Sequence, residues 1–154
     1  MNPPKTWLTA LLLLVLAPPA AAESLKVVAT VPDLGALART VGGDAVTVTV
    51  LAKGPQDPHS VEPRPSFIRK LHDADLYLDG LDFFAVGARR DIFAACHELE
   101  IPAVTAAPLG LSTAFLSFLP GKTSFEEYFR LEGHSEDEQL LRFFIGLAPA
   151  GLHR

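Results

Sequence analysis

KVVATVPDLGALARTVGGDAVTVTVL, residues 26–51, contains three patterns that together predict a class of fold. The apolar run at 26–30 is typical of a buried strand of a parallel sheet. Residues 33–41 place leucine, alanine and valine at helical spacing and stop at a pair of glycines, a signal for the end of a helix. Valine then alternates with threonine over 46–51, which favours a second strand. The order strand, helix, strand indicates an α/β fold.

The same alternation continues downstream. Ser66 can cap a helix that runs toward Ala74, and residues 75–78 follow as a third apolar strand. Parallel strands joined by helices place their connecting loops at the carboxyl edge of the sheet, where ligands usually bind. We therefore expect a ligand site of this chain at that edge.

A second strand, helix, strand unit is predicted further on. Residues 84–99 form a helical pattern, residues 102–107 a short apolar strand, and Pro-Leu-Gly at 108–110 a turn. The helix carries one apolar stripe, made of Ile92, Phe93, Cys96 and Leu99. The predicted fold is α/β, a parallel sheet with flanking helices in two βαβ-type halves.

Two short helices close the chain. Ser124 with Glu127, and Ser135 with Glu138, each form the sequence pattern of a capping box. The apolar residues predicted on these helices are Phe125, Tyr128 and Phe129 on the first and Leu140, Leu141, Phe144 and Leu147 on the second. This apolar surface requires a partner, which is either the rest of the domain or, by self-association, another chain.

Residues 1–22 have the pattern of a secretory signal. Lys5 supplies the positive charge, residues 7–16 are apolar, and Ala20-Ala21-Ala22 matches a cleavage site. The apolar core is too short for a comfortable membrane span. We expect a mature chain that begins at Glu23 and is periplasmic; if the signal is not used, the protein is cytoplasmic.

The net charge and the cysteine count argue against two classes of protein, those that bind nucleic acids and disulfide-rich scaffolds. The chain has 18 acidic and 13 basic residues, a net charge of −5, and loss of Lys5 with the signal makes the charge more negative. Binding to phosphate backbones requires a basic surface, so a nucleic acid partner is not expected. The single cysteine, Cys96, forms no internal disulfide, so the chain is not a disulfide scaffold.

His59 stands in a loop, residues 51–66, that contains four prolines. Each proline fixes its own φ and biases the residue before it away from helix, so the loop is stiff. A stiff loop can present an imidazole to a metal ion at little entropic cost. His59 is therefore a candidate metal ligand, and a solvent-facing histidine is the alternative interpretation.

Residues 27–81 resemble the amino-terminal lobe of the zinc and manganese solute-binding proteins of ABC transporters. The resemblance is carried by VVATVPDLGALARTVGGD, by VTVLAKGPQDPHSVEPRPS and by LHDADLYLDGL. It implies that His59 is the first metal ligand, that the ion is Zn²⁺ or Mn²⁺, and that an ABC transporter permease is a partner.

The chain departs from that family in its length. Family members are about twice as long, and their remaining ligands lie beyond the region of resemblance. Transition-metal sites generally need three or four ligands, so a site with His59 alone is incomplete and is expected to bind weakly.

Residues 73–154 resemble a different family, the ThiF-type adenylyltransferases related to ubiquitin-activating enzymes. The residues that carry this are DADLYLDGLDFFAVGARRDIFAACHELEIPAVTAAPLG (73–110) and FLPGKTSFEEYFRLEGHSEDEQLLRFFIGLAPAGLHR (118–154). The resemblance implies that Asp82 helps to hold magnesium beside ATP, that Arg89 or Arg90 lies near the start of the next helix, and that Cys96 matches a family cysteine. A buried position on the helix stripe is the other interpretation of Cys96.

The sequence lacks the glycine-rich turn with which such enzymes bind ATP. Gly121-Lys122-Thr123 copies the end of a phosphate loop, but Leu116 stands where that motif requires glycine. We therefore expect no ATP or Mg²⁺ cofactor, no catalytic residue and no enzyme.

The two resemblances predict three segments: a signal peptide (1–22), a lobe like that of metal solute-binding proteins (23–78) and a ThiF-like fragment (79–154). The leading hypothesis is an exported zinc- or manganese-binding protein, truncated or fused. The alternative is a non-catalytic or remnant ThiF-type adenylyltransferase fragment.

Overall fold

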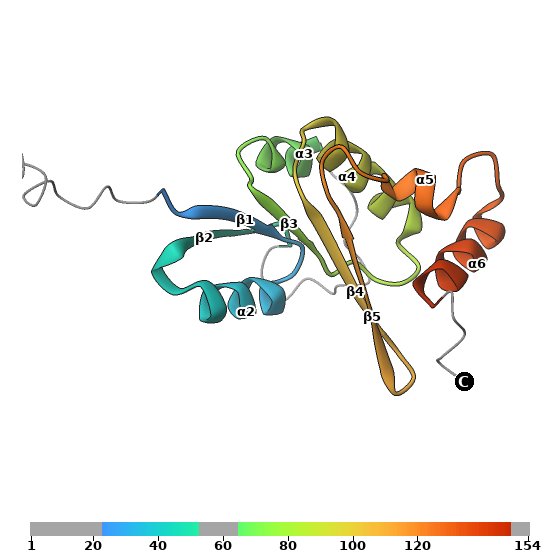
Figure 1. The fold of residues 1–154 in the computed structure, drawn as a ribbon, viewed down its shortest axis with the longest axis horizontal. Coiled ribbons are helices and arrows are strands. Elements are labelled where there is room, and N and C mark those ends of the chain that lie inside the picture. Colours follow the sequence, from blue (N-terminus) through green and yellow to red (C-terminus); the bar gives the residue numbers. More distant parts are fainter. Residues whose placement is uncertain (1–22, 53–64, 149–154) are drawn as a thin grey trace, which may run out of the picture.

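The computed structural model describes residues 23–52 and 65–148, and a five-stranded sheet with helices on both faces runs through them (Figure 1). The elements are β1 (Leu25–Ala29), α2 (Pro32–Gly42), the 3₁₀ helix η1 (Gly43–Ala45), β2 (Val46–Val50), α3 (Pro65–Leu71), β3 (Leu76–Asp79), α4 (Val86–Glu98), β4 (Ala103–Leu109), β5 (Ser112–Phe118), α5 (Phe125–Phe129) and α6 (Glu136–Leu147).

The strand order is β2-β1-β3-β4-β5, and strands β1 to β4 pair in parallel. The predicted α/β class with a parallel sheet and flanking helices is confirmed. The sequence analysis missed β5, which pairs antiparallel to β4. It was also wrong about Pro108 and Leu109, which belong to β4 rather than to the turn; the turn is Gly110-Leu111, where the positive φ of 57° at Gly110 suits glycine.

The connections between the parallel strands run in opposite directions along the sheet, and this places the helices on opposite faces. The connection from β1 leads to β2 at the edge, and the connection from β2 returns past β1 to β3. Because both crossovers are right-handed by rule, their helices must cover different faces. Figure 1 shows α2 on one side of the sheet and α3 and α4 on the other.

The core lies between the sheet and α3 to α6. Tyr77 of β3 is fully buried and packs edge-on against Phe93 of α4, with ring centroids 5.8 Å apart. Phe93 also stacks on Phe125 of α5 at 4.7 Å, and Phe129 contacts Phe143 of α6 at 5.0 Å. A continuous aromatic cluster therefore joins the sheet to the last two helices.

The helix ends agree with the sequence in part. Both capping boxes, at Ser124 and at Ser135, are confirmed. The prediction that Ser66 caps a helix is wrong, because α3 begins one residue earlier, at Pro65, and already ends at Leu71. Proline is favoured in the first turn of a helix, since its missing N–H would have no partner there.

The predicted apolar stripe of α6 is correct for Leu147, 5% exposed, and for Leu140, which is partly buried against the core, but it omits Phe143, which is 1% exposed. Leu141 is 58% exposed and Phe144 is 36% exposed. The helix is apolar around more than one face, so spacing alone did not identify the face that a large ring would bury.

Candidate functional site

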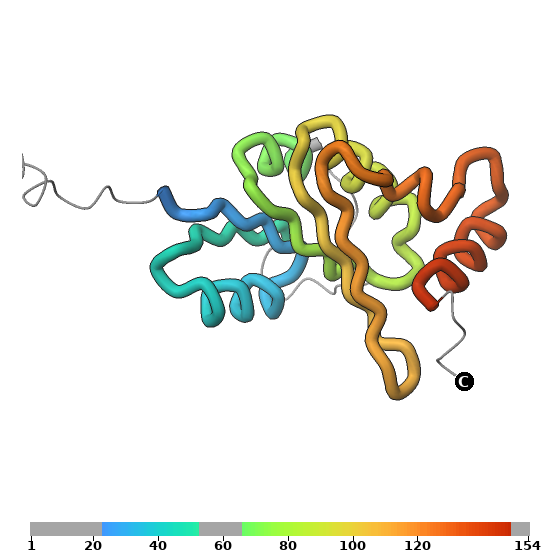
Figure 2. The backbone as a smooth tube through the Cα atoms, in the orientation of Figure 1, coloured from blue at the N-terminus to red at the C-terminus, as the bar shows by residue number. Residues whose placement is uncertain are grey.

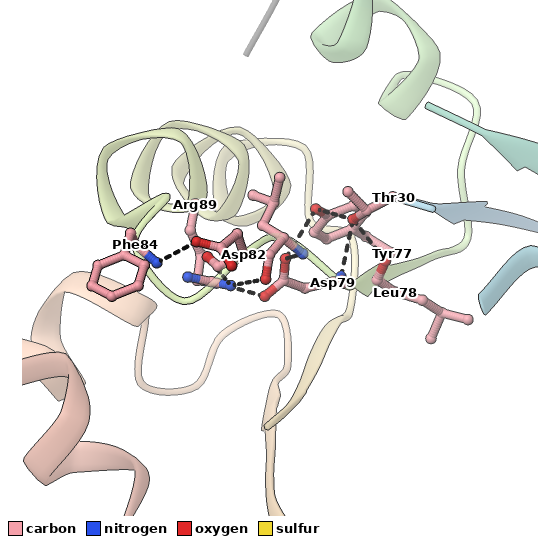
Figure 3. A network of polar contacts seen from close by, with 9 residues as sticks. Thr30, Tyr77, Leu78, Asp79, Asp82, Phe84 and Arg89 are labelled. Atoms are coloured by element: carbon pink, nitrogen blue, oxygen red, sulfur yellow. Dashed lines mark hydrogen bonds and ion pairs between the residues drawn. The ribbon is translucent and has the colours of Figure 1, made fainter. Parts of the chain in front are cut away.

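The carboxyl ends of β1 and β3 are joined by Thr30 (Figure 3). Its hydroxyl donates to the Leu78 carbonyl at 3.1 Å and accepts from the Gly80 N–H at 3.1 Å. The Tyr77 hydroxyl lies 2.8 Å from the same oxygen. Burial, followed by the charge of Asp79, raises the pKa of Tyr77 well above its usual value, so Tyr77 stays a neutral hydrogen-bonding group.

Asp79, the last residue of β3, forms a buried ion pair with Arg89 of α4. Arg89 Nε donates to Asp79 Oδ2 at 2.6 Å, and both side chains are almost completely buried, 4% and 0% exposed. Arg89 Nη2 donates to the carbonyl oxygen of Leu81 at 2.7 Å. The ring of Phe143 lies 4.7 Å from the guanidinium carbon. These contacts fix the β3–α4 connection and neutralise the charge of Arg89.

A groove of about 590 Å³ opens beside this ion pair, at the carboxyl ends of β3 and β4. Its walls come from the β3–α4 connection, from residues 105–110 and from Phe143 and Phe144 of α6. The groove is mostly apolar, and Asp82 and Arg89 are its charged residues.

Asp82 and Arg89, the two residues for which the ThiF resemblance implies a cofactor role, lie together in this groove. Asp82 Oδ1 accepts from the Phe84 N–H at 2.9 Å, a local turn that leads into α4. Its carbonyl oxygen accepts from Arg89 Nη2 at 3.3 Å. Both residues thus have local structural partners, with Arg89 held by Asp79.

His59 lies outside the described residues, so its position rests on the sequence. Within residues 23–52 and 65–148, no three side chains of His, Cys, Asp or Glu are grouped so as to hold a metal ion. His72 is exposed just after α3. The described residues by themselves therefore form no complete metal site.

Cys96 is buried on α4, as the alternative interpretation of that residue predicts. Burial, and to a smaller extent the charge of Asp79, raises the pKa of the Cys96 thiol to about 12. A thiol with so high a pKa has almost no thiolate near neutral pH and is a poor nucleophile. Cys96 is thus a small apolar residue of the core.

The sequence analysis missed the roles of Asp79 and Thr30. The signal available for Asp79 was its two-residue spacing from Tyr77, since alternate residues of a strand face the same side. Because Tyr77 is buried, a carboxylate on the same side requires a cationic partner, and Arg89 is one of two arginines in the next helix.

Comparison with known proteins shows a similarity over the first part of the chain. Residues 27–95 match the family described as ZnuA, zinc-uptake complex component A, periplasmic. The high-affinity zinc uptake system protein ZnuA of Paracoccus denitrificans (strain Pd 1222) is 43% identical over 60 residues, which are 39% of this chain and 18% of that protein. The chain thus spans about a fifth of the length of this relative.

Solved structures also match, with TM-scores below 0.5. Zn(II)-bound AdcA from Streptococcus pneumoniae gives a TM-score of 0.49 at 18% identity, over 82% of this chain and 27% of that one. A crystal structure of ZnuA gives 0.43 at 18% identity, over 82% and 48% of the two chains.

The matched segment extends from β1 to α4 and includes the loop that carries His59. It passes the predicted boundary at residue 78 and contains Asp82 and Arg89, which therefore fall within both resemblances. ZnuA-type solute-binding proteins are binding proteins and not enzymes. Among the described helices, none has both the length and the hydropathy that crossing a membrane requires. Residues 27–95 are thus similar to the zinc-uptake solute-binding proteins.

Proposed function

We propose that this chain is an exported metal-binding protein of the ABC-transporter solute-binding type, with zinc as its first candidate ion, manganese as the second and His59 as a ligand. The observation that carries this proposal is the match of residues 27–95 to the zinc-uptake family. The export pattern of residues 1–22 supports a periplasmic location, and an ABC transporter permease is the corresponding partner. The proposed protein is not an enzyme.

The topology around the His59 loop supports a binding role. β2 ends at Val50 and α3 begins at Pro65, so the loop starts at the carboxyl edge of the parallel sheet. At that edge β1 lies between β2 and β3. Loops at such an edge, where the direction of the crossovers reverses, are the usual place for ligands in open α/β sheets.

The ligand count sets the expected strength of binding. One imidazole gives an incomplete zinc site, which needs further ligands such as carboxylates or a second histidine. We therefore propose weak binding by this chain alone.

Isothermal titration calorimetry of the purified protein with Zn²⁺ tests the proposal. Wild type should release heat with a stoichiometry near one, and His59→Ala should abolish that heat. His72→Ala is the matched control, because it removes an exposed imidazole from the same half of the chain. Equal heats for wild type and His59→Ala would contradict the role of His59, and equal loss in both variants would show non-specific histidine binding.

The alternative function is a non-catalytic or remnant ThiF-type fragment fused at about residue 79. The observation in its favour is that Asp82 and Arg89 line one groove. Against it, Arg89 is already paired with Asp79, which leaves little charge to bind a phosphate. ATP–pyrophosphate exchange above background, lost in Asp82→Asn, would support this alternative over metal capture.

A further inference from the structure

The two edge strands of the sheet differ in how their outer backbone groups are covered. β2 lies at one edge and β5 at the other. An open edge presents unpaired N–H and C=O groups to any other strand, and proteins usually block it with charged side chains, proline or a covering element.

The β2 edge is covered by two cations. The Leu51 N–H donates inward to Ala29, so the alternate residues Val48 and Val50 direct their carbonyl groups outward. Arg39 Nη2 donates to the Val48 carbonyl at 3.2 Å, and Lys70 Nζ donates to the Val50 carbonyl at 3.0 Å. A second strand cannot pair there without displacing both side chains.

The register of the β4–β5 hairpin shows which groups of β5 face outward. Leu109 pairs with Ser112 across a two-residue loop, so these two residues exchange backbone hydrogen bonds. Every second residue of β5 then bonds to β4. The residues between them, Thr113, Phe115 and Ser117, direct their N–H and C=O groups away from the sheet.

Nothing in the sequence of β5 blocks this edge. From Ile101 to Gly121 there is no charged residue, and β5 itself contains no proline. Within the described residues β5 pairs only with β4, and all seven of its residues are exposed or half-buried. Figure 2 shows the hairpin projecting beyond the rest of the sheet. Phe115 is 68% exposed at the centre of β5.

We propose that two copies of this chain associate through their β5 edges, in antiparallel register about Phe115, to form one continuous ten-stranded sheet. In this register Phe115 pairs with Phe115 of the second copy, and Thr113 pairs with Ser117. All three outward-facing residues then meet outward-facing residues, so both rows of N–H and C=O groups are satisfied. The two Phe115 rings lie on the same face and contact each other across the twofold axis.

The same geometry stops assembly at two copies. An antiparallel pair of identical strands is a closed twofold interface that uses both β5 edges. The remaining edges are the two β2 strands, whose outward carbonyl groups are occupied by Arg39 and Lys70. The expected product is therefore a dimer and not a fibre.

Charged side chains introduced at two exposed positions of β5 test the proposed register of the dimer. Thr113→Lys with Ser117→Lys places like charges opposite each other twice in the dimer, whereas Thr113→Lys with Ser117→Glu places opposite charges there. By analytical ultracentrifugation we expect a dimer for wild type, a dissociation constant raised on the order of tenfold or more in the first variant, and a dimer in the second. Circular dichroism checks that both variants fold.

Three outcomes would overturn the proposal. The first is a wild type that stays monomeric at about 100 μM, a concentration well above that of weak specific complexes. The second is a dimer that both charge variants leave unchanged, or that both dissolve equally. The third is a dimer that Leu141→Lys in α6 dissolves while the like-charge variant of β5 does not, because association would then occur through the carboxyl-terminal helices.

Discussion

The β1–α2–β2 unit and the carboxyl-terminal region, residues 86–148, hold their helices by different means. The first unit has no aromatic residue, and its helix approaches the sheet through glycine. Gly35 is buried, and a Cβ atom there would lie 2.6 Å from Val50. The second region holds α4, α5 and α6 together through ring contacts, such as Phe93 of α4 with Phe125 of α5, whose centroids are 4.7 Å apart, and Phe129 of α5 with Phe143 of α6 at 5.0 Å.

Large apolar side chains are exposed on α2, as Leu141 and Ile145 are on α6. Leu37 and Val41 of α2 are 60% and 88% exposed, so much of the apolar side of this helix does not reach the core. Large buried rings contribute more to stability than small aliphatic contacts, because they remove more apolar area from water. Stability is therefore concentrated in the aromatic packing of α4 to α6, and α2 is held more weakly.

The largest effect is expected at the buried ion pair of Asp79 and Arg89, which joins β3 to α4. Arg89→Met leaves a buried carboxylate without its cation and should lower the free energy of unfolding by about 3–5 kcal/mol. Urea denaturation measures this loss. Adding Asp79→Leu should restore most of it, because a buried ion pair can often be replaced by apolar residues of similar volume.

Arg90 provides the matched control for that change. Its pair with Glu126 is partly exposed, with side chains 28% and 36% accessible, so Arg90→Met should cost no more than about 1 kcal/mol. If the Arg89 and Arg90 variants are equally stable, the buried ion pair contributes no more to stability than the partly exposed one.

A smaller effect is expected from one ring of the aromatic cluster. Phe125→Leu keeps an apolar side chain but removes two close ring contacts, and it should cost about 1–2 kcal/mol. Val41→Ala in α2 should change stability by less than about 0.5 kcal/mol, since that side chain is already in solvent. Equal losses in thermal unfolding would contradict the uneven distribution of stability.

Sequence patterns were sufficient for the parallel part of the fold. The apolar run before Pro32, the glycine pair after α2 and the valine–threonine alternation of β2 each act locally, so they could be recognised without any tertiary contact. β5 was missed because its pattern, Ser112–Phe118, follows a turn of only two residues and contains no strong turn signal apart from Gly110.

The candidate site was less accessible to such reasoning. The Asp79–Arg89 pair depends on which face of β3 meets which face of α4, and that is a tertiary property. Phe143 was omitted from the buried side of α6 for the same reason, because the groups that it contacts, the Arg89 guanidinium and the rings of Phe125 and Phe129, come from other helices. His59 remains a prediction from the sequence and the family match.

The smallest effects on stability are expected at the first residues of the helices. α5 and α6 each begin with a capping box, whereas Val31, the N-cap residue of α2, makes no side-chain cap. Ser135→Ala removes the hydroxyl that accepts from the Glu138 N–H and should cost about 1 kcal/mol at neutral pH. Thr40→Ala in α2 is the control, because its exposed hydroxyl only donates to the Ala36 carbonyl of the same helix, and it should have almost no effect.

The pH dependence of stability shows whether Glu138 of the α6 capping box acts through its charge or through its shape. The Ser135 N–H, and then its hydroxyl, hold the pKa of Glu138 below its usual value. A carboxylate with a depressed pKa in the folded state stabilises above its unfolded pKa, and this contribution is lost as the pH falls through the folded value. Glu138→Gln keeps the shape of the side chain but not its charge, so it should be less stable than wild type at pH 7, and the difference should disappear at acid pH, once Glu138 is protonated in the folded state. A difference in melting temperature that persists unchanged at acid pH would show that the side chain acts by packing instead.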